Sequence, residues 1–394
     1  MTETMRTRSG GIRRGATLAS DPDDAAAELF AALDQPDLAL ALVFVSPRYD
    51  LPALAAALQR RFGNALLVGC TSAGEIAPMG YMTGGISGLS LAGPDFAVAC
   101  ERIETLQDFN LQSGQEVVGR LLDGLARAVP QAPGETGRER IFAFTLIDGL
   151  SGAEEAVVSA LHGALDDIPL FGGSAGDDLR FKRTFILHGG EFRSDCALLV
   201  LVSTTRPFRV FKTEHFEATD RKMVVTGADP VRRVVSEIDA EPAAAEYARQ
   251  VGIHDDTLTP LIFANHPVVV RVGGSSFVRS IQKVNDDGSL TFFCAIDEGI
   301  VLTVARGVDL AENLRAQFAQ LEADIGRPAL IIGFDCILRA LELDERNIRA
   351  EVGQLMAGHN VSGFSTYGEQ FHAMHVNQTF TGVAIGYGDG ESKA

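Results

Sequence analysis

Three short turns, each made of small residues and closed by a carboxylate, are the segments of this chain best suited to hold a ligand. They read Gly-Cys-Thr-Ser-Ala-Gly-Glu at 69–75, Gly-Gly-Ser-Ala-Gly-Asp at 172–177 and Ser-Thr-Tyr-Gly-Glu at 365–369. Such turns leave backbone N–H groups free and let a ligand approach the main chain closely. The closing carboxylate disfavours a phosphate and favours a cationic or amphoteric ligand. We therefore predict a ligand cradle formed by Gly69, Cys70, Thr71, Ser72, Gly74, Glu75, Gly173, Ser174, Gly176, Asp177, Ser365, Thr366, Gly368 and Glu369.

The same turns have two other interpretations. In the first, the glycines only connect neighbouring strands, and each carboxylate accepts hydrogen bonds from its own turn. In the second, Cys70 is a nucleophile on a tight turn. Its candidate bases are His188, His215 and His375. The cysteine occurs in one of the three turns and no Ser/His/Asp pattern accompanies it, so we do not expect an enzyme.

One histidine has neighbours that suit a flat apolar cofactor. His215 follows the aromatic segment 208–211 and precedes Phe216. An imidazole between phenyl rings could ligate an iron in such a cofactor. A strand-end histidine with a satisfied hydrogen bond is the alternative for His215.

The elements that must position the three turns repeat along the chain. Each turn follows an apolar strand, an amphipathic helix and a short strand, and a further strand returns after it, over 38–91, 141–202 and 329–386. Agreement across several elements indicates a duplicated β-α-β-β unit. A fourth, degraded copy is predicted over 242–305, with a hairpin that turns at 286–288 because Asp-Gly suits a tight turn.

One helix for every three strands covers a single face of each sheet, so the other face needs a partner. We predict an α/β fold with mixed sheets, in which duplicated β-α-β-β units form two related lobes. The sheets pack face to face and the helices lie outside. The predicted segments are a flexible N-terminal arm at 1–29, an N-terminal domain at 30–232 and a C-terminal domain at 233–388, with the boundary near 229–239.

Composition excludes several classes of function. The chain has 394 residues, with 34 Lys and Arg against 52 Asp and Glu and a formal net charge of −18. Nucleic acid is not an expected partner, because an acidic surface repels phosphates. The apolar runs are far shorter than the ~20 residues that cross a bilayer, and five scattered cysteines indicate no disulfide framework. We expect a cytoplasmic protein without membrane insertion.

Several stretches resemble the FIST sensory proteins, which have a FIST N and a FIST C domain in this order. These stretches are 68–75, 171–177 and 375–386. Three more resemble the NosP-type nitric-oxide-sensing haemoproteins of that family, at 292–299, 334–339 and 363–370. The resemblance implies a sensor and not an enzyme.

The NosP-type resemblance implies haem b, which receives nitric oxide, and a separate signalling partner. That partner would be a sensor histidine kinase or a cyclic-di-GMP enzyme, and a homodimer is a further expectation. We choose His215 as the metal ligand, with His375 and Tyr367 as further cofactor-binding residues. The alternative function is a haem-free module that binds an amino acid or a similar metabolite in the three turns.

Overall fold

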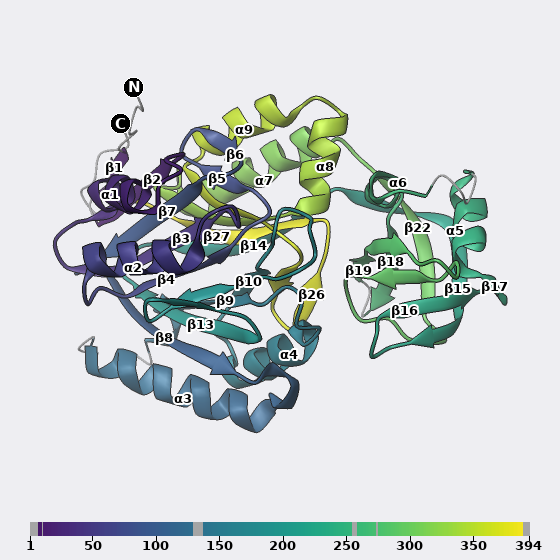
Figure 1. The fold of residues 1–394 in the computed structure, drawn as a ribbon, viewed down its shortest axis with the longest axis horizontal. Helices are drawn as coiled ribbons and strands as arrows, with labels where there is room; N and C mark the ends of the chain where they lie inside the picture. Colours follow the sequence, from purple (N-terminus) through teal and green to yellow (C-terminus); the bar gives the residue numbers. More distant parts are fainter. Residues whose placement is uncertain (1–6, 10, 129–136, 254–257, 273–274, 389–394) are drawn as a thin grey trace.

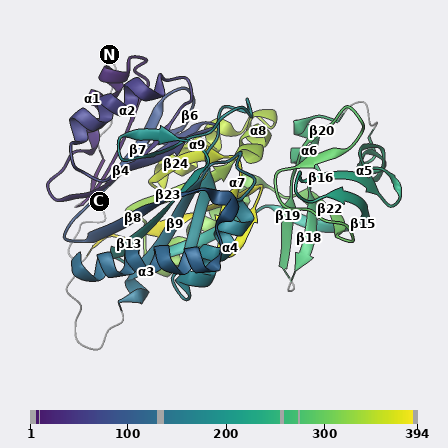
Figure 2. The ribbon, with the colours of Figure 1, turned by 60° about the horizontal axis from the view of Figure 1, so that its bottom comes forward.

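The computed structural model describes residues 7–9, 11–128, 137–253, 258–272 and 275–388. Figure 1 shows a large core beside a smaller domain made of residues 216–307. Figure 2, from another direction, shows the same division. The smaller domain is an insertion, because the chain leaves the core after β14 (Phe208–Glu214) and returns to it at α7 (Leu310–Ile325).

The core consists of three units with the same order of elements. Unit 1 contains β2 (Ile12–Thr17), α1 (Pro22–Leu33), β3 (Leu38–Val45), α2 (Leu51–Phe62), β4 (Leu67–Thr71), β5 (Glu75–Ala77), β6 (Gly80–Met82) and β7 (Ile86–Ala92). Unit 2 contains β8 (Phe96–Glu104), α3 (Leu111–Ala128), β9 (Ile141–Ile147), α4 (Glu154–Leu165), β10 (Leu170–Ser174), β11 (Ile186–His188), β12 (Glu191–Arg193) and β13 (Cys196–Thr204). Unit 3 contains β14, α7, β23 (Leu330–Cys336), α8 (Ile337–Glu345), α9 (Arg349–Gly358), β24 (Val361–Thr366), β25 (Glu369–Phe371), β26 (Met374–Val376) and β27 (Thr379–Ile385).

Strand pairing within each unit confirms the predicted β-α-β-β repeat. The second strand of each unit runs parallel to the strand after the next helix, or in unit 3 after the helix pair α8 and α9, as the pairs β3–β4, β9–β10 and β23–β24 show. The last strand then pairs antiparallel with the second, as in β7–β3, β13–β9 and β27–β23. The predicted α/β class with mixed sheets is therefore confirmed.

Each unit also lends a hairpin to a neighbouring unit. The hairpin β5–β6 of unit 1 pairs with β24 of unit 3, β11–β12 of unit 2 pairs with β4 of unit 1, and β25–β26 of unit 3 pairs with β10 of unit 2. This cyclic exchange makes each sheet a product of two units. Each of the three turns lies where the chain crosses from one sheet to another, so the exchange of hairpins brings the three turns to one end of the core.

The inner faces of the three sheets form one apolar core. Phe44, Phe171, Phe334 and Phe364 from all three units are fully buried there. The rings of Phe44 and Phe364 stack with centroids 4.7 Å apart, and those of Phe171 and Phe334 lie 5.3 Å apart. Burying each such ring stabilises the fold by about 1.5–3 kcal/mol. The helices cover the outer faces with separate apolar clusters, as predicted.

The inserted domain has a sheet and an apolar cluster of its own. Its elements are β15 (Phe216–Asp229), β16 (Val234–Ile238), β17 (Glu241–Pro242), α5 (Ala243–Val251), α6 (Pro260–Asn265), β18 (Val268–Val272), β19 (Ser275–Arg279), β20 (Ile281–Val284), β21 (Leu290–Phe292) and β22 (Val301–Gly307). The hairpin predicted at 286–288 is confirmed by the pairing of β20 with β21.

Three expectations about organisation are wrong. The strands described within 242–305 pair antiparallel, so this segment is no fourth β-α-β-β copy. The core has three related units where two lobes were expected, and the predicted boundary near 229–239, which falls between β15 and β17, stays a prediction. Much of the predicted arm at 1–29 is ordered, because β2 pairs with β7 and α1 packs beneath the same sheet; residues 1–6 lie outside the described residues.

Candidate functional site

The three small-residue turns meet one another at one end of the core. Their contact is cyclic and uses the backbone: Ala73 N donates to Ser365 O at 2.9 Å, Gly176 N to Thr71 O at 3.0 Å, and Ser174 N to Gly368 O at 2.8 Å. The structure thus brings the three predicted turns together. These amides are already satisfied by neighbouring turns, so the assembled turns form a packed surface at which little of the main chain stays free.

Close packing explains the glycines of the turns. A Cβ atom on Gly176 would lie 2.8 Å from Ala73 N, and one on Gly69 would lie 2.0 Å from Val43 O. Distances this short cannot be tolerated without movement of the backbone. Gly74 additionally has φ +131°, a conformation that side chains disfavour. The need for glycine therefore follows from contact between units at Gly176 and from the close pairing of β3 with β4 at Gly69.

The carboxylates that close turns 1 and 3 accept hydrogen bonds from their own units. Glu75 accepts from Ser72 Oγ at 2.5 Å and from Gly85 N at 3.3 Å. Glu369 accepts from Thr379 N at 3.2 Å and from its Oγ1 at 2.8 Å. Burial raises the pKa of Glu75 to about 8 and that of Glu369 well above its ordinary value. At neutral pH each is a mostly uncharged brace for the strand that follows.

The carboxylate of turn 2 organises a loop. Asp177 accepts hydrogen bonds from Phe181 N at 2.8 Å and Lys182 N at 2.7 Å, and the hydroxyl of Tyr367 also donates to it. The Tyr367 ring stacks on Phe181 with centroids 4.7 Å apart. Burial and the hydrogen bond to Asp177 raise the pKa of Tyr367. Cys70, in turn 1, is fully buried, and burial raises the pKa of its thiol, so it is a neutral core residue.

His215 lies in a buried polar network at the root of the inserted domain. Its Nδ1 is 2.9 Å from Arg339 Nη1, and its Nε2 is 2.7 Å from Glu342 Oε2. Because a guanidinium only donates, Nδ1 must accept, and the proton therefore sits on Nε2. Burial lowers the pKa of His215, which keeps the ring neutral. Both ring nitrogens are engaged.

The residues predicted to hold haem do not fit that group in this structure. An iron ligand needs a free ring nitrogen or phenol oxygen, and His215 and Tyr367 each use those atoms in hydrogen bonds. The Nδ1 of His375 is 3.2 Å from Gln370 Nε2. Its Nε2 would lie only 2.6 Å from a Cβ atom on Gly368, so turn 3 covers that nitrogen.

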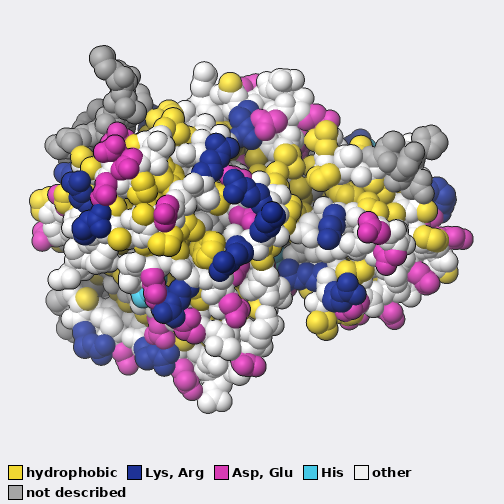
Figure 3. Space-filling model, viewed as in Figure 1, with side chains coloured by type: hydrophobic (Ala, Val, Ile, Leu, Met, Phe, Trp, Pro, Cys, Tyr) yellow, Lys and Arg dark blue, Asp and Glu magenta, His cyan; other side chains and the backbone are white. Residues whose placement is uncertain are grey.

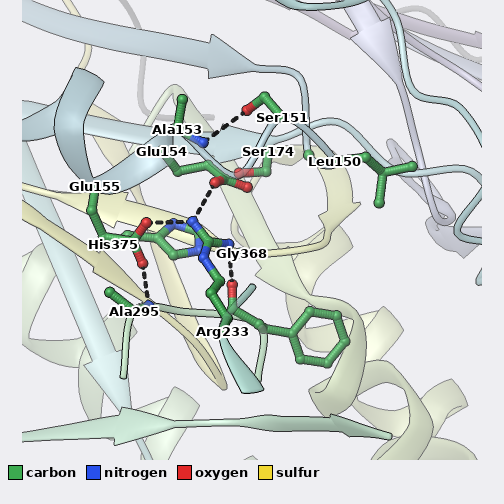
Figure 4. Close-up of polar contacts among 12 residues, drawn as sticks. Leu150, Ser151, Ala153, Glu154, Glu155, Ser174, Arg233, Ala295, Gly368 and His375 are labelled. Atoms are coloured by element: carbon green, nitrogen blue, oxygen red, sulfur yellow. Dashed lines mark hydrogen bonds and ion pairs between the residues drawn. The ribbon is translucent and has the colours of Figure 1, made fainter. Parts of the chain in front are cut away.

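His375 instead belongs to a charged junction between the core and the inserted domain. Arg233, from the inserted domain, forms an ion pair with Glu154 at 2.7 Å and another with Glu155. The same guanidinium donates to Phe293 O at 2.7 Å, and Ala295 N donates to Glu155 Oε1 at 2.6 Å. Figure 4 shows these groups gathered around the imidazole of His375, with Gly368 and Ser174 beside it. We call this set of contacts the junction clasp.

Local structure places each part of the junction clasp. Glu154 and Glu155 occupy the first turn of α4, where the helix dipole favours negative charge. Arg233 has φ 54° at the bend between β15 and β16, which points its side chain back to the core. Burial alone would raise the pKa of Glu155, but the basic groups His375 and Arg233 lower it. Burial lowers the pKa of His375, and the neighbouring Glu155 and Glu154 act in the opposite direction.

Several buried polar atoms beside the junction clasp have no hydrogen-bond partner within the described part of the chain. They are both amide atoms of Asn377, Oε1 of Gln378 and Oγ of Ser280. The amide of Asn377 would lie 3.1 Å from a Cβ atom on Gly368, on the same side of that glycine as His375. Leaving a buried polar group unpaired costs about 1–3 kcal/mol. Such a group indicates a place for a bound water or ligand.

Two domain matches define the class of protein: a sensory module that binds small ligands in signalling proteins. The FIST N domain matches residues 39–241, and the FIST C domain matches residues 243–372. The chain therefore belongs to the FIST family. It is also similar to an uncharacterized protein of Methanocaldococcus jannaschii, with 22% identity over 357 residues that cover 80% of this chain and 67% of that protein. None of the described helices is both long and apolar enough to span a bilayer.

The residues that sequence reasoning missed are those supplied by the junction. Arg233 stood in a segment expected to link two lobes. Glu154 and Glu155 have the sequence pattern of ordinary helix-starting acids. Asn377 carried a usable signal, because an Asn-Gln pair interrupts the otherwise apolar approach to β27.

Proposed function

We propose that this protein is a sensory module that binds a small amphoteric metabolite, such as an amino acid, at the junction between the inserted domain and the core. It performs no catalysis in this role. Ligand binding changes how firmly the junction clasp holds the inserted domain. A separate signalling protein reads that change.

The observation that carries the proposal is the fully buried side-chain amide of Asn377, which has no hydrogen-bond partner among the described residues. An amide offers two donors and one acceptor oxygen, which suits a ligand that has both kinds of polar atom. Turn 3 lies against it on one side, at Gly368. Gln378 Oε1 and Ser280 Oγ are further buried polar atoms without a partner among the described residues. A polar ligand would satisfy these groups and recover the free energy that their burial costs.

The charges of the junction support the amphoteric class. An ammonium group is attracted by the carboxylates of Glu154 and Glu155, and a carboxylate is attracted by Arg233. Arg279, whose Nη1 lies 3.5 Å from His375 O, adds a second guanidinium at the same place. Groups of both charges are therefore present at this junction, where Arg233 pairs with Glu154 and Glu155.

The partner follows from the position of the site. In this proposal, ligand binding changes the contact between the core and the inserted domain. Signalling proteins commonly respond to a ligand by such a rearrangement of domains. A sensor histidine kinase or a cyclic-di-GMP enzyme is the partner that the NosP-type resemblance implies. Coexpression with such a protein, and its activity with and without ligand, tests this part of the proposal.

The proposal is tested by a thermal-shift screen of the free amino acids against the full chain and two variants. At 100 times Kd, a ligand adds about 2.7 kcal/mol of stability. Asn377→Leu should keep or raise the stability of the ligand-free protein and lose the response to ligand. Asn360→Leu is the matched control, because the Asn360 amide is already paired with Arg14 and Pro328. It should lower stability and keep the response. A ligand response that Asn377→Leu leaves intact would overturn the proposal.

A haem-based nitric-oxide sensor is the second candidate, supported by the similarity of 292–299, 334–339 and 363–370 to NosP-type proteins. Haem binding would require His215 to give up its hydrogen bond to Glu342 or to Arg339, or turn 3 to move away from His375. An absorption spectrum taken before and after addition of hemin separates the two functions. A Soret band that shifts with nitric oxide and disappears in His215→Ala would favour this candidate over the first.

A further inference from the structure

The cyclic exchange of hairpins gives the core three equivalent junctions, of which the site proposed above is one. Each hairpin packs against a helix of the unit that receives it, β6 against α9, β12 against α2 and β26 against α4. Strand register puts three residues at the same place in the middle of the second hairpin strand: Tyr81, Phe192 and His375. The residue opposite the first hairpin strand is a glycine each time, namely Gly363, Gly69 and Gly172. The three junctions are thus variants of one site.

The three junctions are filled in different ways. At Tyr81 the space is taken by protein, since the phenol donates to Asp335 at 2.6 Å and the fully buried Arg339 binds the same carboxylate. At His375 the inserted domain covers the junction. At Phe192 the start of α2 and the hairpin β11–β12 enclose a cavity of about 680 Å³ that opens to solvent. This volume lies within the 300–1,000 Å³ range of small-molecule sites.

The lining of this cavity selects a ligand chemistry. Most of it is apolar or aromatic, from Tyr49, Leu51, Pro52, Phe185 and Phe192. Figure 3 shows hydrophobic side chains over the region of α2, with basic side chains towards the inserted domain.

The charged groups at the cavity differ in their partners. Glu191 is paired with Arg193 at 2.8 Å and with Arg102 at 3.1 Å. Asp50 caps α2 by accepting from Ala53 N at 3.1 Å. The guanidinium of Arg183 lies over the Phe185 ring, 5.0 Å from its centroid, and has no ion-pair partner among the described residues.

We infer that the cavity between α2 and β11–β12 is a second ligand site, which takes a small carboxylate with an aromatic or branched apolar body. The apolar body packs against Phe192 and Tyr49, and the carboxylate pairs with Arg183. The inference rests on this cavity alone and does not depend on the junction clasp.

The test uses phenylacetate and its uncharged analogue phenylacetamide as probes, titrated calorimetrically into the full chain. We expect saturable binding of phenylacetate at least tenfold tighter than that of phenylacetamide. Arg183→Gln should remove this preference, because only the carboxylate needs the guanidinium. Arg180→Gln is the matched control. Arg180 belongs to the same loop, but it pairs with Asp178, and neither residue lines the cavity.

Two further variants separate this site from the junction clasp. Phe192→Ala should weaken both probes, and Asn377→Leu should weaken neither. The inference is overturned if phenylacetate shows no saturable binding at millimolar concentration, or if Arg183→Gln keeps the full preference. It is also overturned if Asn377→Leu alone abolishes binding, because the probe would then occupy the junction between the domains.

Discussion

Replacement of Glu75 by Gln distinguishes a structural brace from a ligand-binding carboxylate. Burial raises the pKa of Glu75 to about 8 from an ordinary value of 4.5. Between these two values the unfolded chain is ionised and the folded chain is not, so folding stability falls as pH rises. Each pH unit in that window costs about 1.4 kcal/mol. The loss is complete near pH 8 and absent below about pH 4.5.

The magnitude can be worked out for an ordinary pH range. With the two pKa values above, ionisation of Glu75 in the unfolded chain makes the free energy of unfolding about 2.5 kcal/mol smaller at pH 7 than at pH 5. Gln cannot ionise, and its amide can still donate to Ser72 Oγ and accept from Gly85 N. The free energy of unfolding of Glu75→Gln, relative to that of the wild type, should therefore rise by about 2.5 kcal/mol between pH 5 and pH 7.

Urea unfolding of both proteins at pH 5, 6, 7 and 8 measures this difference. Glu116→Gln, on the exposed face of α3, is the control and should track the wild type at every pH. A constant difference between Glu75→Gln and the wild type would refute the assignment of Glu75 as a buried, mostly neutral brace.

Three further substitutions test other contacts. Arg233→Gln breaks both ion pairs of the junction clasp. Hydrogen exchange where the inserted domain meets the core should become at least tenfold faster. Unchanged exchange would show that these ion pairs do not hold the two domains together. Gly176→Ala places a methyl group 2.8 Å from Ala73 N, and overpacking of this kind costs about 1–3 kcal/mol, so thermal unfolding should occur earlier. Tyr367→Phe removes a donor to Asp177 and should cost about 1–2 kcal/mol in urea unfolding, and a loss near zero would show that this hydrogen bond does not contribute.

The repeat could be predicted from sequence because its strands are local and fully buried. Residues 38–45, 141–147 and 330–336 are near-continuous apolar runs, as expected for strands covered on both faces. The exchange of hairpins could not be predicted, because its pairs join segments far apart along the chain. The strand β2 was missed for a similar reason. Its sequence, Ile-Arg-Arg-Gly-Ala-Thr, looks like a basic arm until β7 provides a partner.

Prediction of the candidate site was limited by the same long-range geometry. The sequence indicated that another group comes close to the backbone of Gly69, Gly176 and Gly368. This is so, but the groups that come close belong to this chain and not to a ligand. Whether a ligand also touches the turns stays a prediction. Arg233 meets Glu154 and Glu155 only because the inserted domain folds back on the core, which no local pattern records.

The most direct test of the central claim is hydrogen exchange of the full chain with and without an amino acid found by the thermal-shift screen. Binding at the interface of the inserted domain should slow exchange in 151–155, 293–296 and 368–378 together, and Asn377→Leu should abolish the effect. Slower exchange confined to other segments, or an unchanged effect in that variant, would contradict the assignment of the ligand to this interface.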